Sequence, residues 1–174
     1  IAWVKHRNID TMTLAAEIAR LSDQEKVDAV FVDGVGIGAG VVDRLRQLGR
    51  EVFDVQSGGK PSGFLQEPFK VKNKRAEMWT AMRGWLATGA IPDDAELEAD
   101  LTNIEYGYDG DNSLMLERVE DLKKRGLASP DSATALALTF AEPVAPKSEN
   151  TRILQQANQR SAYEDYDPYG PNAR

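Results

Sequence analysis

An apolar run, Val27 to Val32, is followed at once by Asp33 and then by a loop with alternating glycines. Apolar residues at both odd and even positions of this run predict a strand that is covered on both faces, as in the centre of an α/β sheet. After the glycines, apolar residues recur at helical spacing up to Gly49, and a short strand is predicted at Glu51 to Val55. This order of strand, helix and strand predicts an α/β layered fold with parallel pairs and right-handed crossovers.

Spacing, caps and turn residues predict the remaining elements. They are a strand at 1–7, a helix from Asp10, a helix at 73–87, a short helix after Pro92, a hairpin at 103–117 and a last helix from Ser129 and Pro130. From Glu142 onward the chain is polar and rich in proline, with too little apolar content to pack alone. We therefore expect one domain at 1–141 and a flexible C-terminal tail at 142–174.

The composition restricts the chemistry that the chain can perform. It contains no cysteine and a single histidine, His6, which excludes thiolate and multi-histidine metal sites. Any metal must be held by oxygen, and a hard cation such as Mg²⁺ or Mn²⁺ is favoured. The net charge of -7 argues against a generic nucleic-acid coat. No apolar run reaches the roughly 18 residues of a membrane span, and no signal peptide is recognisable, so we expect no membrane association.

Asp33 is the first candidate for a catalytic or metal-binding carboxylate. A loop without side chains lets a bulky polyanion approach an acid at a strand end, but a tight turn with Asp33 as a local cap explains the same residues. A dinucleotide site needs G-x-G-x-x-G, whereas here the third glycine comes one place early. A nucleotide-binding α/β enzyme therefore remains an alternative that depends on the glycines alone.

Asp131, in the first turn of the last helix, is the second candidate. An acid at this position is usually explained by the helix dipole. Together with Asp33, however, it gives the skeleton of an oxygen-only metal site. A two-metal phosphodiesterase needs about three or four carboxylates, so two acids are too few.

Three stretches of the sequence resemble a known family when they are taken in order. They are VDAVFVDGVGIGAGVVDRLRQLG, NKRAEMWTAMRGWL and LKKRGLASPDSATALALTFA. They are similar to the nuclease domain of the large terminase subunit of tailed bacteriophages, in the ribonuclease H-like, resolvase-related superfamily. The resemblance runs from about Ile9 to Ala141. It implies an α/β fold with a ribonuclease H-like mixed central sheet flanked by helices, an added β-hairpin and the polar tail.

The resemblance also implies which residues form the site. Asp33 matches the second metal-binding acid and Asp131 the acid of the last helix, so both are expected as catalytic metal ligands for Mg²⁺ or Mn²⁺ in a two-metal site. The family's first acid has no counterpart, because residues 1–7 look like the third strand of the fold. Thr134 stands where the family often has another aspartate. We therefore expect a metal-dependent endonuclease domain that is impaired in this fragment.

Basic residues near these elements fit DNA as the substrate. The predicted phosphate contacts are Lys74, Arg75, Lys123, Lys124 and Arg125. A solvated charged face is the alternative for either cluster.

The family cuts concatemeric double-stranded DNA during packaging in the host cell cytoplasm. The implied partners are DNA, the ATPase domain of the full-length subunit, the small terminase subunit and the portal. No Walker motif occurs, so the chain is expected to be the nuclease part. A catalytically degenerate module that docks to DNA or the portal is the alternative function.

Overall fold

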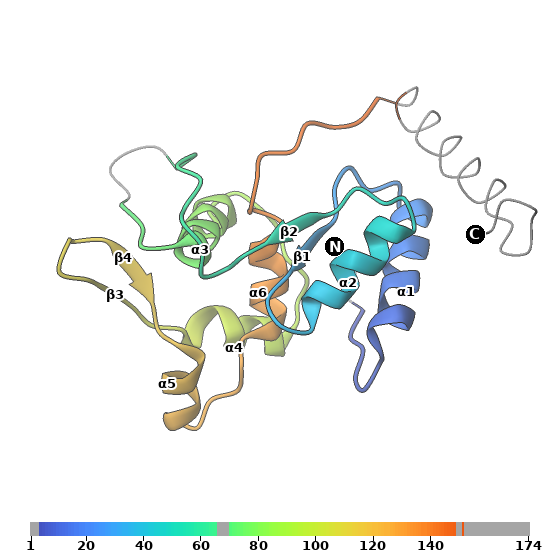
Figure 1. The fold of residues 1–174 in the computed structure, drawn as a ribbon. Coiled ribbons are helices and arrows are strands. Elements are labelled where there is room, and N and C mark those ends of the chain that lie inside the picture. Colours follow the sequence, from blue (N-terminus) through green and yellow to red (C-terminus); the bar gives the residue numbers. More distant parts are fainter. Residues whose placement is uncertain (1–3, 66–69, 149–150, 152–174) are drawn as a thin grey trace, which may run out of the picture.

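The computed structural model describes residues 4–65, 70–148 and 151, and it confirms an α/β chain. The elements in chain order are α1 (Thr11–Gln24), β1 (Phe31–Asp33), α2 (Gly38–Gln47), β2 (Phe53–Val55), α3 (Lys74–Leu86), α4 (Ala95–Asn103), β3 (Tyr106–Tyr108), β4 (Leu114–Leu116), α5 (Val119–Lys124) and α6 (Asp131–Leu138). Figure 1 shows α1 and α2 at one end of the molecule and the β3–β4 hairpin at the other. No helix of the described part of the chain has the length and apolar character needed to cross a membrane.

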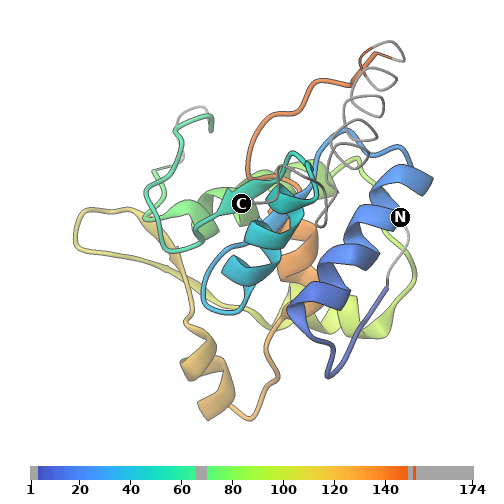
Figure 2. The same cartoon turned by 45° about the vertical axis from the view of Figure 1, so that its right-hand side comes forward.

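The parallel pair β1–β2 lies between two layers of helices. On one side α1 packs on α2, and the two lie side by side in Figure 2. Their buried residues form a cluster with Val32 of β1 packed against it: Ala15, Ala19, Val41 and Leu45. On the other side, α3, α4 and α6 form a larger cluster around Val55: Met78, Trp79, Met82, Leu97, Ala133, Leu136, Ala137 and Ala141. The predicted covering of this strand pair on both faces is confirmed.

The sheets are smaller than the sequence predicts. Within the described residues, β1 pairs only with β2 and β3 only with β4, so the predicted mixed central sheet is not seen as one sheet. β1 begins at Phe31 and β2 at Phe53, although strands were expected from Val27 and Glu51. The apolar pattern reports burial, but a strand also needs a partner for its backbone groups. This explains why the strands are shorter than their apolar runs.

Residues 4–7 are not a strand, so this part of the prediction for residues 1–7 is wrong. Val4 is exposed, and the Lys5 ammonium donates a hydrogen bond to Glu96 Oε2 of α4 at 2.7 Å. In the described part of the chain, no strand pairs with these residues. Residues 1–3 lie outside the described residues.

Two helices begin at capping side chains, Asp10, which the sequence predicts as a cap, and Asn73, which it predicts as the start of a helix. Asp10 Oδ1 accepts hydrogen bonds from the N–H groups of Met12 and Thr13, and Asn73 Oδ1 accepts one from Ala76. Such side chains satisfy N–H groups that have no partner within the helix. The predicted helices from Asp10 and at 73–87 are therefore confirmed, and the residues that begin them are those that the sequence indicates.

The hairpin at 103–117 is also confirmed, as β3 and β4 joined by a turn. Asp109 Oδ1 accepts hydrogen bonds from the N–H groups of Asp111 and Ser113, and Asn112 has a positive φ of 58°. On its other side β4 is bridged to Val71. The hairpin is thereby attached to the segment that leads into α3.

The described start of the predicted tail contacts the rest of the chain. Glu142 Oε1 lies 2.8 Å from Lys74 Nζ, and the backbone N–H of Lys147 donates to Asp28 Oδ1 at 2.8 Å. The predicted tail residues 149–150 and 152–174 lie outside the described residues. Residues 142–148 therefore cross from α6 to the start of β1.

Candidate active site

Asp33 is the last residue of β1 and is half-buried. Its Oδ2 accepts a hydrogen bond from Ser57 Oγ at 3.2 Å, and its Oδ1 accepts one from the N–H of Val35 at 3.3 Å. The carboxylate is thus held at the carboxyl end of the parallel pair. In open α/β sheets this edge is where ligands bind.

Ser57 is itself held by the start of α3. The N–H groups of Lys74 and Arg75 donate to the carbonyl oxygens of Gly59 and Ser57, each at 2.9 Å. These N–H groups belong to the first turn of the helix, where no carbonyl within the helix is available. The orientation of Asp33 therefore depends on a loop that α3 fixes.

Packing explains two of the glycines after Asp33. A Cβ on Gly38 would lie 1.8 Å from the carbonyl oxygen of Asp33, and one on Gly34 would lie 1.8 Å from Asp54 Oδ1. Gly36 has a positive φ of 63°, which L side chains rarely adopt. The loop consequently turns back tightly onto the strand end, as the simpler interpretation of the sequence predicts.

Asp33 and α6 lie on the same face of the strand pair. Phe31 and Asp33 are two residues apart, so their side chains point to one face, and Val55 is the register partner of Asp33. Val55 belongs to the buried cluster that contains Ala133 of α6, and Phe31 packs against that cluster. α6 also contacts β1 directly. The helix that begins at Asp131 therefore covers the face on which Asp33 lies.

Asp131 is exposed and lies beside a carboxylate that sequence reasoning missed, Asp100 of α4. Asp100 Oδ2 accepts hydrogen bonds from the N–H groups of Ser132 at 2.9 Å and Ala133 at 3.2 Å. Burial raises the pKa of Asp100, these two hydrogen bonds lower it, and the neighbouring Asp131 raises it further. The sequence suggested that Ser129 caps the last helix. The N-terminus of α6 is instead capped by Asp100 of α4, and its own N-cap residue, Pro130, makes no capping hydrogen bond.

The candidate carboxylates do not form a complete metal cluster. Among the described residues, no group of three or more His, Cys, Asp or Glu side chains is placed so that it could hold a metal ion. Thr134, one turn after Asp131, is half-buried, and its N–H donates to the Pro130 carbonyl. The residues present thus supply oxygen ligands of the expected kind but fewer than a two-metal site requires.

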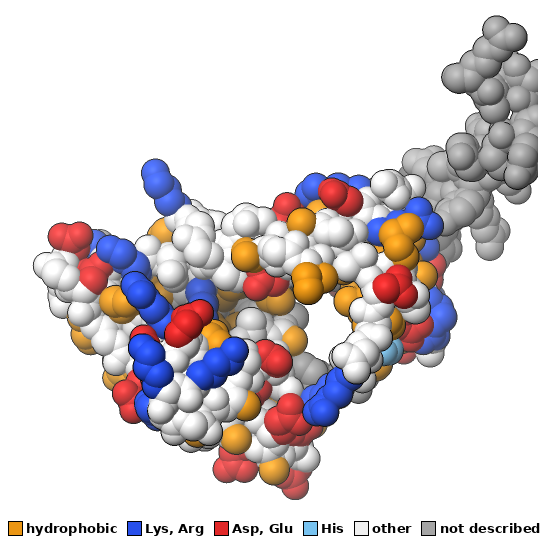
Figure 3. Space-filling view, turned by 60° about the horizontal axis from the view of Figure 1, so that its bottom comes forward, with side chains coloured by type: hydrophobic (Ala, Val, Ile, Leu, Met, Phe, Trp, Pro, Cys, Tyr) orange, Lys and Arg blue, Asp and Glu red, His pale blue; other side chains and the backbone are white. Residues whose placement is uncertain are grey.

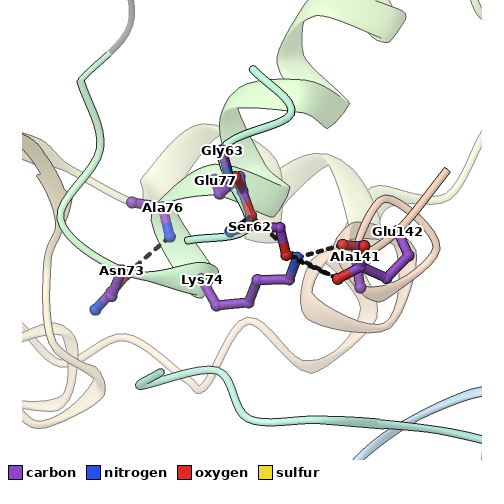
Figure 4. A network of polar contacts seen from close by, with 8 residues as sticks. All are labelled: Ser62, Gly63, Asn73, Lys74, Ala76, Glu77, Ala141 and Glu142. Carbon is purple, nitrogen blue, oxygen red and sulfur yellow. Dashed lines mark hydrogen bonds and ion pairs between the residues drawn. The ribbon is translucent and has the colours of Figure 1, made fainter. Parts of the chain in front are cut away.

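Lys74 was predicted to contact a DNA phosphate, but its ammonium bonds to groups within the protein. Its side chain is buried, and its ammonium contacts Ser62 Oγ at 2.6 Å, Glu77 Oε2 at 3.0 Å and Glu142 Oε1 at 2.8 Å. It also donates to the carbonyl oxygen of Ala141 (Figure 4). An ammonium has three N–H donors, and all can be used by these acceptors. Lys74 therefore links α3, the 57–63 loop and the end of α6 and does not face DNA.

Arg75 is also largely engaged within the protein. Its Nη1 donates to the carbonyl oxygen of Glu117 at 2.8 Å, and burial lowers the pKa of its guanidinium. A half-buried Arg that spans α3 and the end of β4 is better suited to holding these elements together than to binding a phosphate. The sequence pattern K-N-K-R did not distinguish these two roles.

The three basic residues around the end of α5 are exposed. Lys124 pairs with Asp121 at 2.6 Å, and Arg125 pairs with Glu105 at 3.2 Å, whereas no ion pair is seen for Lys123 within the described residues. Figure 3 shows Lys and Arg side chains gathered over α5 and the hairpin, with acidic side chains between them. This face is accessible but of mixed charge.

Comparison with solved structures identifies the fold. No protein-family model and no curated protein sequence matches the chain. The nuclease domain of the large terminase subunit gp2 of bacterial virus Sf6, in a variant with manganese and beta-thujaplicinol, matches with a TM-score of 0.62 at 22% identity, over 79% of this chain and 74% of that chain. The chain has the fold of a phage terminase nuclease domain.

Two further structures of the same nuclease domain also match the fold of this chain. The gp2 variant with calcium matches with a TM-score of 0.62 at 22% identity, over 80% of this chain and 76% of that chain. The Sf6 nuclease domain without a named ligand gives 0.56 at 22% identity, over 75% and 72%. The predicted resemblance to terminase nuclease domains is thus confirmed as a likeness of fold.

Within this terminase nuclease fold, Ser57 and Asp100 are the site neighbours that sequence reasoning missed. Ser57 lies 24 residues from Asp33, and Asp100 lies 32 residues from Ser132. No local pattern marks either one, since both contacts are made only when distant elements pack.

Proposed function

We propose that this chain is the nuclease domain of a viral DNA-packaging terminase and acts as a divalent-metal-dependent endonuclease on concatemeric double-stranded DNA. One observation supports this most strongly. In a fold shared with terminase nuclease domains, an oriented carboxylate, Asp33, lies at the carboxyl end of β1, on the face covered by α6. We further propose that the fold is ribonuclease H-like, with the nuclease domain at 1–141 and a flexible tail beyond it.

We assign Asp33 and Asp131 as the metal ligands. Mg²⁺ usually keeps several waters and is bound through about one or two carboxylates together with substrate phosphates, and oxygen is also suited to Mn²⁺. Asp33 is half-buried and Asp131 exposed, and the described residues add no third ligand that would complete a two-metal site. A bound cation would supply an activated water and neutralise charge on the departing 3′-oxygen of a phosphodiester.

The residues of the chain itself contribute orientation and access. Ser57 fixes one carboxylate oxygen of Asp33, and Asp100 fixes the first turn of the helix that begins at Asp131. The segment from Gly34 to Val42 carries no charge, so that it does not repel an approaching polyanion. Lys123, Lys124 and Arg125 remain the proposed phosphate contacts, because they are exposed, whereas Lys74 and Arg75 have structural roles.

The partners follow from this proposal. They are double-stranded DNA, an ATPase domain in the full-length subunit, and the small terminase subunit and portal of the packaging machinery, in the host cell cytoplasm. Because the described residues provide no group of three metal-binding side chains, activity of the isolated chain is expected to be weak.

One observation favours a second candidate, a catalytically degenerate module that docks to DNA or the portal. It is the lack of a cluster of three metal-binding side chains among the described residues, with Thr134 in place of an acid. Such a module would bind DNA equally well with and without a chelator. It would cleave DNA under no metal condition.

Cleavage of supercoiled plasmid tests the two candidates against each other. We expect nicking with Mn²⁺ that EDTA abolishes. The nicking rate should fall by about tenfold or more in Asp33→Asn and Asp131→Asn, because each substitution removes a group that acts in the transition state. Asp43→Asn, an exposed acid of α2, is the matched control and should retain activity. DNA binding by gel shift in EDTA, without cleavage in any metal, would favour the docking module and contradict the nuclease.

A further inference from the structure

β3 is an edge strand whose outer side has no partner among the described residues. β4 is paired on both sides, with β3 and with Val71, whereas β3 pairs only with β4. An unpaired edge presents a row of free N–H and C=O groups that can template another strand. Figure 1 shows the hairpin projecting from the end of the molecule that lies away from α1 and α2, so the edge is accessible.

The hydrogen-bond pattern shows which groups point outward. The N–H of Glu117 donates to the carbonyl of Glu105 at 2.8 Å, and the N–H of Asp109 donates to the carbonyl of Ser113 at 3.0 Å. In an antiparallel pair, backbone groups that face the partner alternate along the strand. Residues 105, 107 and 109 therefore face β4. The N–H and C=O groups of Tyr106 and Tyr108 point to the outer edge.

The side chains of β3 expose two aromatic rings to solvent. Tyr106 and Tyr108 are 58% and 61% exposed, and their rings contact edge to face with centroids 6.3 Å apart. Gly107 points to the opposite face of the strand, where a Cβ would meet no atom within 4 Å. β3 is short, at three residues, but it carries neither a lysine nor a proline that would block the pairing of another strand.

The charge around the tyrosines determines which partner fits. Residues 105–117 contain Glu105, Asp109, Asp111 and Glu117 and no Lys or Arg. Lys72 compensates Asp109 at 2.6 Å, while the Glu105 side chain remains 69% exposed although it pairs with Arg125. Asp111 is exposed as well. Arg125 also pairs with Glu117, so Asp111 and the exposed part of Glu105 are the carboxylates left for a cationic partner, and a second copy of the chain would bring the same acids and the same net charge of -7.

We propose that the outer edge of β3 binds an extended, arginine-containing segment of a partner protein by strand addition. Backbone hydrogen bonds to Tyr106 and Tyr108 supply affinity, as in other cases of β-augmentation. Guanidinium groups of the added strand stack on the two tyrosine rings and pair with Glu105 and Asp111. This surface is separate from Asp33 and requires no metal.

A synthetic peptide of about ten residues that alternates valine and arginine is the probe, with the intact chain. We expect it to bind about tenfold or more tightly than a valine–glutamate peptide of the same length. A valine–arginine peptide with proline at every second valine should also bind about tenfold more weakly, because it lacks N–H donors. On binding, the amides of Tyr106 and Tyr108 should gain protection from hydrogen exchange.

Two variants of Tyr108 distinguish the contribution of its backbone N–H to peptide binding from that of its side chain. Tyr108→Pro removes an outward N–H without removing a β3–β4 hydrogen bond and should weaken the peptide about tenfold, whereas Tyr108→Phe should bind like the parent. Thermal melting checks that both variants are folded. Equal binding of Tyr108→Pro and the parent, protection of the Tyr106 and Tyr108 amides by an oligonucleotide and not by the peptide, or a concentration-dependent dimer through β3 would each overturn the proposal.

Discussion

Lys74 and Glu77 form an ion pair inside the protein, with Nζ and Oε2 3.0 Å apart and Glu77 fully buried. The other interactions of Glu77 are hydrogen bonds from the N–H groups of Ser62 and Gly63, at 2.9 and 2.7 Å. One carboxylate thus fixes the loop that follows Ser57, and the loop in turn orients Asp33. Lys74, which the sequence suggested as a phosphate contact, is instead part of the support for the site.

Glu77→Ala should lower the free energy of unfolding by about 3 kcal/mol, because removing one partner leaves a buried charge and two N–H groups without their acceptor. Glu96→Ala is the matched control. It removes the exposed partner of Lys5 and should cost less than about 1 kcal/mol. Urea denaturation measures both, and equal effects of the two substitutions would contradict the role given to Glu77.

Substitution of Gly38 should disturb the strand end next to Asp33. A Cβ there would lie 1.8 Å from a backbone oxygen, which cannot move aside as a side chain can. Gly38→Ala is expected to cost about 2–3 kcal/mol, whereas Gly58→Ala, where a Cβ meets nothing within 4 Å, should change stability by about 0.5 kcal/mol or less. Thermal melting compares the two, and a Gly38→Ala protein as stable as the parent would rule out the tight turn.

The cap that α4 provides to α6 gives a third prediction. Asp100→Ala removes the acceptor for two N–H groups of α6 and should cost about 1 kcal/mol, while Asp100→Asn keeps an oxygen in place and should cost less. Amide hydrogen exchange at Ser132 and Ala133 reports the cap directly. If Asp100→Ala leaves their exchange unchanged, the capping contact does not exist in solution.

The hairpin turn should lose stability in acid. The hydrogen bond from Lys72, assisted by the N–H groups of Ser113 and Asp111, lowers the pKa of Asp109 from 3.8 to about 2. A carboxyl whose pKa is depressed by folding contributes its full stability above its unfolded pKa and loses it as the pH falls through the folded value. This contribution should therefore be present above about pH 4 and disappear toward pH 2.

An NMR titration of Asp109 tests that assignment. Lys72→Met should raise the pKa of Asp109 toward 3.8, whereas Lys70→Met should not, because Lys70 donates to the Asp111 carbonyl and not to a carboxylate. A pKa that stays near 2 in Lys72→Met would show that the ion pair is not its main cause.

Local sequence signals predicted much of the fold. Asp10, Asn73 and the turn residues around Asp109 act through neighbours within a few residues, so their effects are visible in the sequence. Periodic apolar residues correctly indicated the helices from Asp10 and at 73–87. Burial of the strand on both faces was predictable for the same reason.

Contacts between distant segments were not predictable in this way. The burial of Lys74 depends on Glu142, which lies 68 residues away, and a lysine in a basic cluster gives no sign of such a partner. The strand expected at 1–7 failed because alternation does not reveal whether a neighbouring strand exists. Asp33 was found because it ends an apolar run, whereas Ser57 and Asp100 have no comparable marker.

A titration of Mn²⁺ into the isotope-labelled chain, followed by paramagnetic broadening of its amide signals, tests the proposed metal site most directly. The proposal predicts broadening that is confined to residues next to Asp33, such as Gly34 and Val35, and to the first turn of α6, and that Asp33→Asn abolishes while Asp43→Asn does not. Signals that stay sharp up to about 10 mM Mn²⁺, or broadening that Asp33→Asn leaves unchanged, would contradict it.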